Sequence, residues 1–231
     1  SADSPTDAMR KKSRNSIAVG SQWVKEGKAG GFVSAGSTGT VVAAATLGLR
    51  YLEGIRRAAI AVLIEGEKHP FLVRDVGANP MPKAHHFAQY ALMGSAYYEC
   101  QFQKSEPRVG LLNIGSEEMK GNTLVRDARG MMKNMPINFH GNIEGSEIFS
   151  GDCHVVVTDG FSGNVLLKSS EGVAEYLLRM TFGEMMKAGI APEQIKAVQK
   201  AVMPRVDFSE YGGAVLLGVE GYVTICYRRS P

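Results

Sequence analysis

Residues 58–79 read AAIAVLIEGEKHPFLVRDVGAN, in which two short apolar runs precede a small polar turn. The runs at 58–64 and 71–76 are short and almost wholly apolar, so the sequence predicts two buried strands. The second run leads into Gly77-Ala78-Asn79, and glycine and asparagine are residues that turns favour. A buried strand followed by such a turn recurs along the chain and decides the predicted fold.

Helices alternate with short strands over most of the chain. Further strands are predicted at residues 31–35, 109–114, 137–140 and 154–158. Helices are predicted at residues 4–30, 40–50, 83–103, 122–133 and 163–187. This alternation favours a mostly parallel sheet that is covered on both faces. The predicted fold class is therefore α/β, with three α/β/α layers, in one domain that spans residues 1–231.

The composition is that of an ordinary globular protein, with 231 residues of which 44% are apolar and 21% charged. The net charge of +3 is too small to indicate a nucleic-acid partner. Three widely spaced cysteines form no CxxC pair, which disfavours disulfides and zinc, and Cys100 and Cys153 are predicted to be core thiols. Neither a signal peptide nor a run of about 18 apolar residues is visible, so a cytoplasmic protein is expected.

Six loops rich in glycine and small polar residues flank the predicted strands. They are residues 34–39, 75–79, 113–122, 141–145, 159–164 and 211–213. Ligand sites of open α/β sheets lie beyond the carboxyl ends of the strands, so the loops are predicted to converge on one cleft. Glycine lets the backbone approach an anion closely, and N–H groups at a helix start point toward it.

Each loop alone is better explained as a structural turn, but six in succession favour a phosphate-type site. Lysines beside the loops add positive charge, and asparagines offer neutral donors. The candidate phosphate-binding residues are Ser34, Gly36, Ser37, Thr38, Gly39, Asn79, Asn113, Gly115, Gly121, Asn122, Asp159, Gly160, Gly163, Lys168, Gly212 and Gly213.

Several other sites are disfavoured. The 34–39 loop is neither a Walker A sequence nor a GxGxxG fingerprint, and no GxSxG elbow indicates a serine hydrolase. His85 and His86 are adjacent in a predicted helix and point apart, so no metal site is expected. The basic run at 10–14 is either a solvated helix face or a docking site for an acidic carrier or anionic lipid.

Taken together, the loops resemble the bacterial phosphate acyltransferases of phospholipid synthesis, the acyl-ACP:phosphate acyltransferases. The resemblance extends from residue 1 to about residue 221, through motifs of specific order and spacing. These motifs are GFVSAGSTGT (31–40), DVGAN (75–79), QYALMGSAYYE (89–99), RVGLLNIGSEEMKGN (108–122), NFHGNIEG (138–145), VVVTDGFSGNVLLKSSEG (155–172) and YGGAVLLGVEG (211–221).

The resemblance implies a fold similar to isocitrate and isopropylmalate dehydrogenases. It also implies transfer of a long-chain acyl group from acyl carrier protein to inorganic phosphate, giving an acyl phosphate that a glycerol-phosphate acyltransferase uses. The family's catalytic lysine and asparagine fall on Lys120 and Asn164. A homodimer without cofactor or metal is expected, docked peripherally on the membrane through an amphipathic, protruding helical tip at about residues 180–206.

Departures from the family pattern leave alternatives open. The family's N-terminal Asp-Ala-Met-Gly-Gly-Asp motif has no counterpart, and Tyr227-Arg228-Arg229-Ser230 stands where the family has His-Gly-x-Ser. One alternative is a truncated, non-catalytic paralogue that retains dimer and membrane surfaces. Another is a phosphotransacetylase-like enzyme that uses CoA thioesters. At the residue level, Lys120 could be a turn lysine, Asn164 a helix N-cap, and the tip a dimer-packing helix pair.

Overall fold

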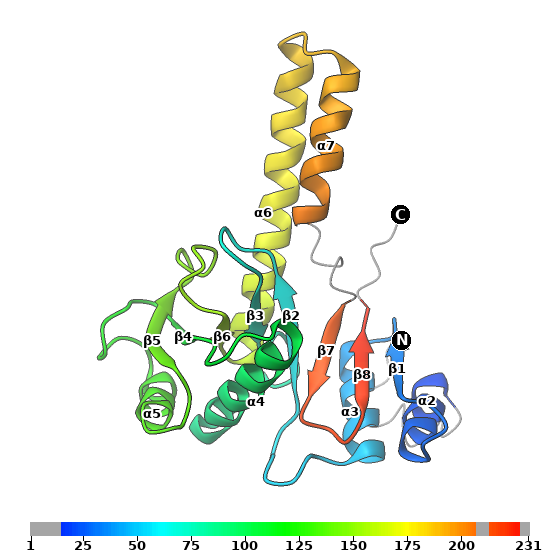
Figure 1. The fold of residues 1–231 in the computed structure, drawn as a ribbon, viewed down its shortest axis with the longest axis vertical. Coiled ribbons are helices and arrows are strands. Elements are labelled where there is room, and N and C mark those ends of the chain that lie inside the picture. The colour runs from blue at the N-terminus through cyan, green and yellow to red at the C-terminus, as the bar shows by residue number, and fades with distance from the viewer. Residues whose placement is uncertain (1–14, 207–212, 227–231) are drawn as a thin grey trace.

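The computed structural model describes residues 15–206 and 213–226, and in them a single twisted sheet is flanked by helices (Figure 1). The strands follow the order β1-β8-β7-β2-β3-β6-β4-β5 across the sheet. Their bounds are β1 Gly31–Ser34, β2 Ala59–Ile64, β3 Phe71–Arg74, β4 Val109–Asn113, β5 Phe139–Glu144, β6 Val155–Val157, β7 Ala214–Leu217 and β8 Tyr222–Ile225. The helices are α2 Ser16–Lys25, α3 Thr38–Leu49, α4 Ala84–Phe102, α5 Thr123–Met132, α6 Gly160–Lys187 and α7 Pro192–Val206.

The direction of the strands divides the sheet. Parallel pairs join β1 to β8, β3 to β6, β6 to β4 and β4 to β5. Antiparallel pairs join β2 to β3, β2 to β7 and β7 to β8. It follows that β3, β4, β5, β6 and β7 run one way, while β1, β2 and β8 run the other. The predicted α/β class with a mostly parallel sheet is confirmed, but strands β7 and β8 were not predicted.

Helices cover both faces of the sheet, and each face has its own apolar core. Side chains of α3 and the first part of α6, such as Val41 and Leu167, pack on one face. Side chains of α4 and α5, such as Phe87 and Met132, pack on the other. Strand β2 is buried at every position because it lies between these layers. Burial of each large aliphatic side chain contributes roughly 1.5–3 kcal/mol, which makes the apolar runs the main source of stability.

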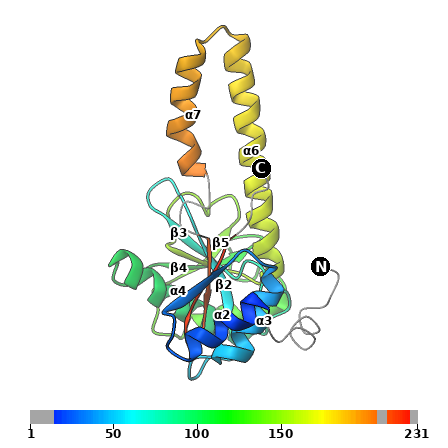
Figure 2. The same ribbon diagram turned by 90° about the vertical axis from the view of Figure 1, so that its right-hand side faces the viewer.

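Helices α6 and α7 form a hairpin that stands away from the sheet (Figures 1 and 2). The first turns of α6 lie against the sheet, and the rest of the helix extends beyond it beside α7. Residues 180–206 all lie in this hairpin or in its turn. None of the helices in the described ranges is both long and apolar enough to cross a membrane.

The cysteines only partly match the sequence prediction. Cys153 is fully buried, and burial raises the pKa of its thiol to about 12, as expected for a core residue. Cys100 is exposed, so the prediction of a core thiol was wrong there. Cys100 lies two residues after the buried Tyr98 on α4, and two residues on a helix turn a side chain by about 200°, away from the sheet.

Candidate functional site

Three of the predicted loops leave the sheet at one edge. Residues 75–79, 159–164 and 113–122 follow β3, β6 and β4, which are adjacent and parallel. The carboxyl ends of these strands therefore bring Asn79, Asn164 and Lys120 to the same edge. This edge carries both residues predicted to be catalytic.

The expectation that all six loops share one edge was wrong. Loop 34–39 follows β1, whose direction is opposite to that of β3, and Gly213 precedes β7 rather than following a strand. Both segments meet the end of β8 at the other edge: Ser34 O accepts from Cys226 N at 2.9 Å, and Gly213 packs on the backbone of Ile225 and Cys226. Gly141 and Asn142 lie within β5 instead of in a loop, and Gly212 falls outside the described residues.

Loop 75–79 is held by a buried carboxylate. Asp75 is fully buried, and its Oδ1 accepts from the backbone N–H groups of Gly77 and Ala78 at 3.1 and 3.0 Å. Its Oδ2 accepts from Asn79 N at 2.7 Å and from Asn79 Nδ2 at 2.9 Å. The loop amides that could have met an external anion are thus already paired with an anion of the protein.

Asn79 is a structural residue of this loop. Its side chain is buried, and Nδ2 donates to Ala58 O at 2.7 Å as well as to Asp75 Oδ2. Both amide protons are used inside the protein, so Asn79 has no donor left for phosphate while these bonds persist. The prediction that Asn79 binds phosphate does not fit this geometry.

The start of α6 is capped by its own carboxylate. Asp159 Oδ1 accepts from Phe161 N at 2.9 Å and from Ser162 N at 2.8 Å, and Oδ2 accepts from Ser162 Oγ at 2.8 Å. Asp159 was predicted to contact phosphate, but it serves as the N-cap of the helix. The first amides of α6 are therefore occupied, and a carboxylate stands where an anion would approach.

Asn164 lies in the second turn of α6 and is exposed. Because Asp159 is the N-cap, Asn164 has no capping role. Its Nδ2 lies over Gly77, where a Cβ atom would approach to 2.9 Å. None of the hydrogen bonds between described residues engages the Asn164 side chain. Its amide is available to a ligand at the loop edge.

The loop that carries Lys120 is braced by two asparagines. Asn113 Nδ2 donates to Lys120 O at 3.0 Å, and its Oδ1 accepts from Ile114 N at 2.9 Å. Asn142 Nδ2 donates to Glu117 O at 2.8 Å. Gly121 has a φ of +90° and packs on the Asn113 side chain, a position that only glycine fits well.

The Lys120 side chain is 52% exposed, and its Nζ lies 4.0 Å from Glu117 Oε1, at the limit of an ion pair. It packs over Gly115, where a Cβ would come within 3.0 Å of Lys120 Cγ. Asn122 caps α5 by accepting from Val125 N at 2.9 Å, so its carbonyl oxygen is occupied. Lys120 is the one cationic side chain in residues 113–122, and its ammonium group is accessible.

The remaining predicted residues have local partners. Lys168 lies one turn after Asn164 on α6 and pairs with Glu171, with Nζ 2.8 Å from Oε2. Ser34 Oγ accepts from Gly36 N at 3.1 Å. Ser37 is the N-cap of α3, which contains Thr38 and Gly39.

Gly160 and Gly163 lie against the 75–79 loop. Gly160 does so through a hydrogen bond from its N–H to Asn79 O at 2.8 Å.

One buried charge was not singled out from the sequence. Arg74 is fully buried, its Nη2 donates to Leu217 O at 3.2 Å, and its guanidinium lies 5.5 Å from the centre of the Tyr90 ring. Burial lowers its pKa to about 10, while the neighbouring Asp75 acts in the opposite direction. An Arg-Asp pair inside the apolar run FLVRDV was the signal that could have marked it.

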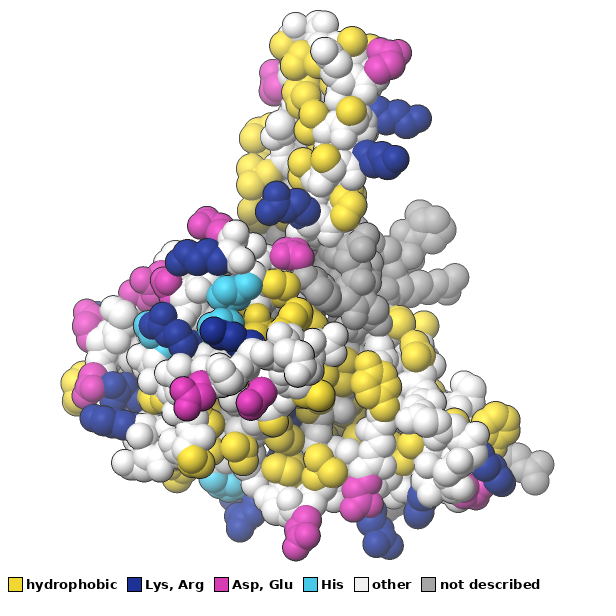
Figure 3. Space-filling view, in the orientation of Figure 1, with side chains coloured by type: hydrophobic (Ala, Val, Ile, Leu, Met, Phe, Trp, Pro, Cys, Tyr) yellow, Lys and Arg dark blue, Asp and Glu magenta, His cyan; other side chains and the backbone are white. Residues whose placement is uncertain are grey.

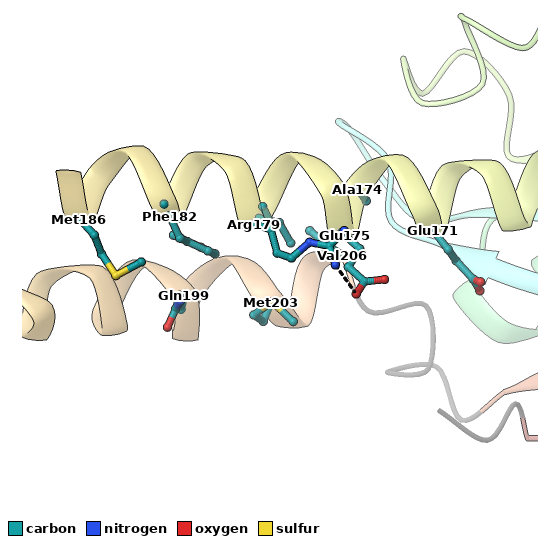
Figure 4. A pocket seen from close by; sticks show the side chains of 11 residues that line it. Glu171, Ala174, Glu175, Arg179, Phe182, Met186, Gln199, Met203 and Val206 are labelled. Carbon is teal, nitrogen blue, oxygen red and sulfur yellow. Dashed lines mark ion pairs between the residues drawn. The ribbon is translucent and has the colours of Figure 1, made fainter. Parts of the chain in front are cut away.

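A separate apolar cavity of about 360 Å³ lies between α6 and α7 (Figure 4). Phe182 and Met186 from α6 face Met203 from α7 across it, and Arg179 Nη1 lies 3.9 Å from Glu175 Oε1 at one side. Neither Lys120 nor Asn164 lines this cavity. Within the described residues, no cluster of three or more histidine, cysteine or acidic side chains is suited to a metal ion.

Comparisons with known proteins agree with this architecture. The phosphotransacetylase from Streptococcus pyogenes superimposes with a TM-score of 0.64 at 18% identity, covering 95% of this chain and 64% of that one. The 4-hydroxythreonine-4-phosphate dehydrogenase from Klebsiella pneumoniae gives a TM-score of 0.52 at 11% identity, covering 92% of this chain and 60% of that one. Likeness at this level of identity concerns the fold alone, and it confirms the predicted dehydrogenase-like class.

Sequence comparisons are more specific. The family model described as "Fatty acid synthesis protein" matches residues 1–231. The phosphate acyltransferase of Clostridium kluyveri is 42% identical over 230 residues, which cover 98% of this chain and 68% of that protein. The phosphate acyltransferase of Heliobacterium modesticaldum is 46% identical over 233 residues, covering 99% and 69%. The chain spans about two thirds of the length of these relatives, and it belongs to the phosphate acyltransferase family of fatty acid and phospholipid synthesis.

Proposed function

We propose that this chain transfers a long-chain acyl group from the thioester of acyl carrier protein to inorganic phosphate. Family membership supports the reaction class. The observation that carries the assignment of residues is the edge shared by Lys120 and Asn164, one with an accessible ammonium and the other with an exposed side-chain amide. An anion and a polarised carbonyl are the two groups that this chemistry must hold.

The reaction requires no nucleophile from the protein. A phosphate oxygen attacks the thioester carbon, a C–O bond forms, the C–S bond breaks, and the carrier leaves as its thiol after taking the proton of the attacking phosphate. Lys120 would hold the phosphate dianion, and the Asn164 amide would donate to the oxyanion that forms on the carbonyl. The main task of the site is then to place two substrates against each other.

The test is phosphate-dependent release of carrier thiol from palmitoyl-ACP, with acyl phosphate trapped by hydroxylamine. We expect release that requires phosphate and falls about 100-fold or more in Asn164→Ala, as for loss of an oxyanion donor. Asn134→Ala is the matched control, because Asn134 is an exposed asparagine whose Nδ2 bonds only locally, to Gly130 O. Wild-type activity in Asn164→Ala would contradict the role of that residue.

Two rivals are separated by the same assay. Faster turnover of palmitoyl-CoA than of palmitoyl-ACP would favour a phosphotransacetylase-like enzyme. A folded protein without phosphate-dependent release from either thioester would favour a non-catalytic member of the family that keeps only its interaction surfaces.

We infer the remaining partners from family membership: a homodimer in the cytoplasm, supplying acyl phosphate to a glycerol-phosphate acyltransferase, with no nucleic-acid partner. The α6–α7 hairpin is our candidate for peripheral membrane contact. In the space-filling view its surface carries many apolar side chains, with Lys or Arg side chains at its right-hand side and also at the front near its base (Figure 3). Exposed apolar residues of the hairpin include Tyr176, Met180 and Met186. This mixture is typical of helices that lie in a lipid interface.

Flotation with vesicles that contain anionic lipid tests the membrane contact. Met180→Glu is expected to reduce binding several-fold, because Met180 is 46% exposed on the hairpin and does not line the cavity between α6 and α7. Leu92→Glu, an exposed apolar position on α4, is the control and should bind like the wild type. Unchanged vesicle binding of Met180→Glu together with loss of the dimer would show that the hairpin packs against a second copy instead.

A further inference from the structure

Asp75 is a buried carboxylate that the proposed reaction does not use directly. It accepts five hydrogen bonds, from the backbone N–H groups of Ile60, Gly77, Ala78 and Asn79 and from Asn79 Nδ2. Four of the five donors belong to the loop that follows β3. Carboxylates bonded in this way order several residues of backbone, since each bond to a charged group is stronger than a neutral one.

The loop that Asp75 orders is the seat of α6. Asn79 O accepts from Gly160 N at 2.8 Å, which fixes the first residue of the helix. Gly163 packs so closely on the Asp75 carbonyl that a Cβ atom would overlap it. One residue further on, Asn164 lies with its side-chain amide over Gly77. Three successive contacts thus link the loop to the helical turn that carries Asn164.

We propose that Asp75 is a positioning residue for Asn164 and acts through the backbone of residues 77–79. The inference rests on the proposed catalytic role of Asn164. Asp75 is buried and its oxygens are filled by protein donors, so it does not meet substrate. Its effect is to hold the surface on which the Asn164 amide rests, and oxyanion donors are effective only when held in place before the reaction.

The first test is Asp75→Asn, which keeps the size of the side chain. Either orientation of the amide turns an NH2 group toward N–H donors, so part of the loop loses its acceptor. We expect kcat and kcat/KM for palmitoyl-ACP to fall together by about 10-fold or more, as for loss of an interaction made only in the transition state. Asp152→Asn is the matched control, because Asp152 is a half-exposed aspartate that also accepts from neighbouring side chains.

A double mutant separates positioning from a general structural role. If Asp75 acts through Asn164, then Asp75→Asn combined with Asn164→Ala is no slower than Asn164→Ala alone. If the two losses multiply, the positioning role is wrong while the proposed function stands. An Asn164→Ala enzyme with full activity would instead overturn the role of Asn164, and the positioning role with it.

Gly77→Ala provides a second route that leaves Asp75 intact, should Asp75→Asn fail to fold. Gly77 has a φ of +137°, and an added methyl group would lie 2.9 Å from Asn164 Nδ2, so the amide must shift. We expect a drop in kcat of about 10-fold with Asn164 present and no further drop in the Asn164→Ala background. Gly54→Ala controls for the strain of a positive φ, since Gly54 has a φ of +77° and open space around it. An equal drop in both backgrounds would overturn the proposal.

Discussion

Lys120 and Asn164 are held in different ways by the residues around them. The Lys120 side chain has one weak ion pair and extends from a loop that Asn113 and Asn142 fix by their amides. The Asn164 side chain rests on glycine, and its place depends on the backbone beneath it. A lysine can reach its target by adjusting its long side chain, whereas a short amide must be placed by the fold.

Replacing Lys120 by alanine is expected to slow turnover by an amount that corresponds to about 3 kcal/mol of barrier, as for loss of a group that stabilises an anion. The free energy of unfolding should change little, because the side chain is half exposed and its ion pair is long. Steady-state kinetics and denaturant unfolding of Lys120→Ala measure the two quantities. Lys104→Ala, another exposed lysine, serves as control, and unchanged turnover in Lys120→Ala would contradict the assignment.

At this scale the sequence could predict which residues are polar and small, but not what they bind. Asn79 and Asn164 both follow a buried strand, and both were candidate ligands. Asn79 finds its acceptor at Ala58 O, 21 residues earlier, and is buried there. The side chain of Asn164 lies over Gly77, a residue that is also far away in the sequence. Such non-local partners decide between a structural and a functional asparagine, and no local pattern contains them.

Helix α6 combines a tightly packed start with a loosely packed outer half, and its glycines differ accordingly. A Cβ on Gly163 would overlap the carbonyl of Asp75, whereas a Cβ on Gly183 would meet nothing within 4 Å. Glycine in a helix interior is otherwise less favourable than alanine by about 1 kcal/mol.

The same substitution is therefore expected to have opposite effects at these two positions. Gly183→Ala should raise the free energy of unfolding by about 0.5–1 kcal/mol, because it reduces the freedom of the unfolded chain. Gly163→Ala should lower it by about 1–3 kcal/mol, because the helix must move away from the loop. Urea unfolding of both variants measures the difference. Equal shifts of the same sign would contradict the close packing at Gly163.

Helices and strands with a strong local pattern of apolar residues were predicted from the sequence. Strands that form only by pairing with strands distant in the sequence were not. The apolar run of β2 and the long α4 were recognised from their own residues. Strands β7 and β8 have only four residues each, and β7 pairs with β2 from more than 150 positions away in the sequence. The reversed direction of β1 relative to β3 depends on these two strands. Because the sequence did not reveal them, loop 34–39 and Gly213 were predicted at the wrong edge of the sheet.

Two histidines make the stability of the whole molecule depend on pH. Burial lowers the pKa of His154 to about 4, with further lowering by the positive neighbours His69, Lys104 and Arg108. The pKa of His86 is lowered to about 4 as well, chiefly by burial and then by the nearby positive charges of His85 and Arg57. In both rings Nδ1 accepts a backbone N–H, from Arg108 and Lys83 respectively, which requires the neutral form.

Acid is consequently expected to destabilise the protein through these rings. A histidine whose pKa is lower in the folded state binds its proton more readily when unfolded, so stability is intact above pH 6.5 and falls as the pH drops toward about 4. Urea unfolding between pH 7 and 4 measures the slope, which should be shallower in His154→Gln. His140→Gln replaces an exposed histidine and is the control. Equal slopes in the wild type and in His154→Gln would contradict this account.

The continuity of α6 has a mechanical consequence. Its 28 residues form one rod about 42 Å long, clamped near one end where Gly160 and Gly163 meet the 75–79 loop. Asn164 sits at the clamp, and the other end belongs to the hairpin. A force applied to the hairpin therefore acts through α6 about its contacts with the 75–79 loop. Any partner that binds the outer half of α6 holds the same continuous helix that presents the Asn164 amide.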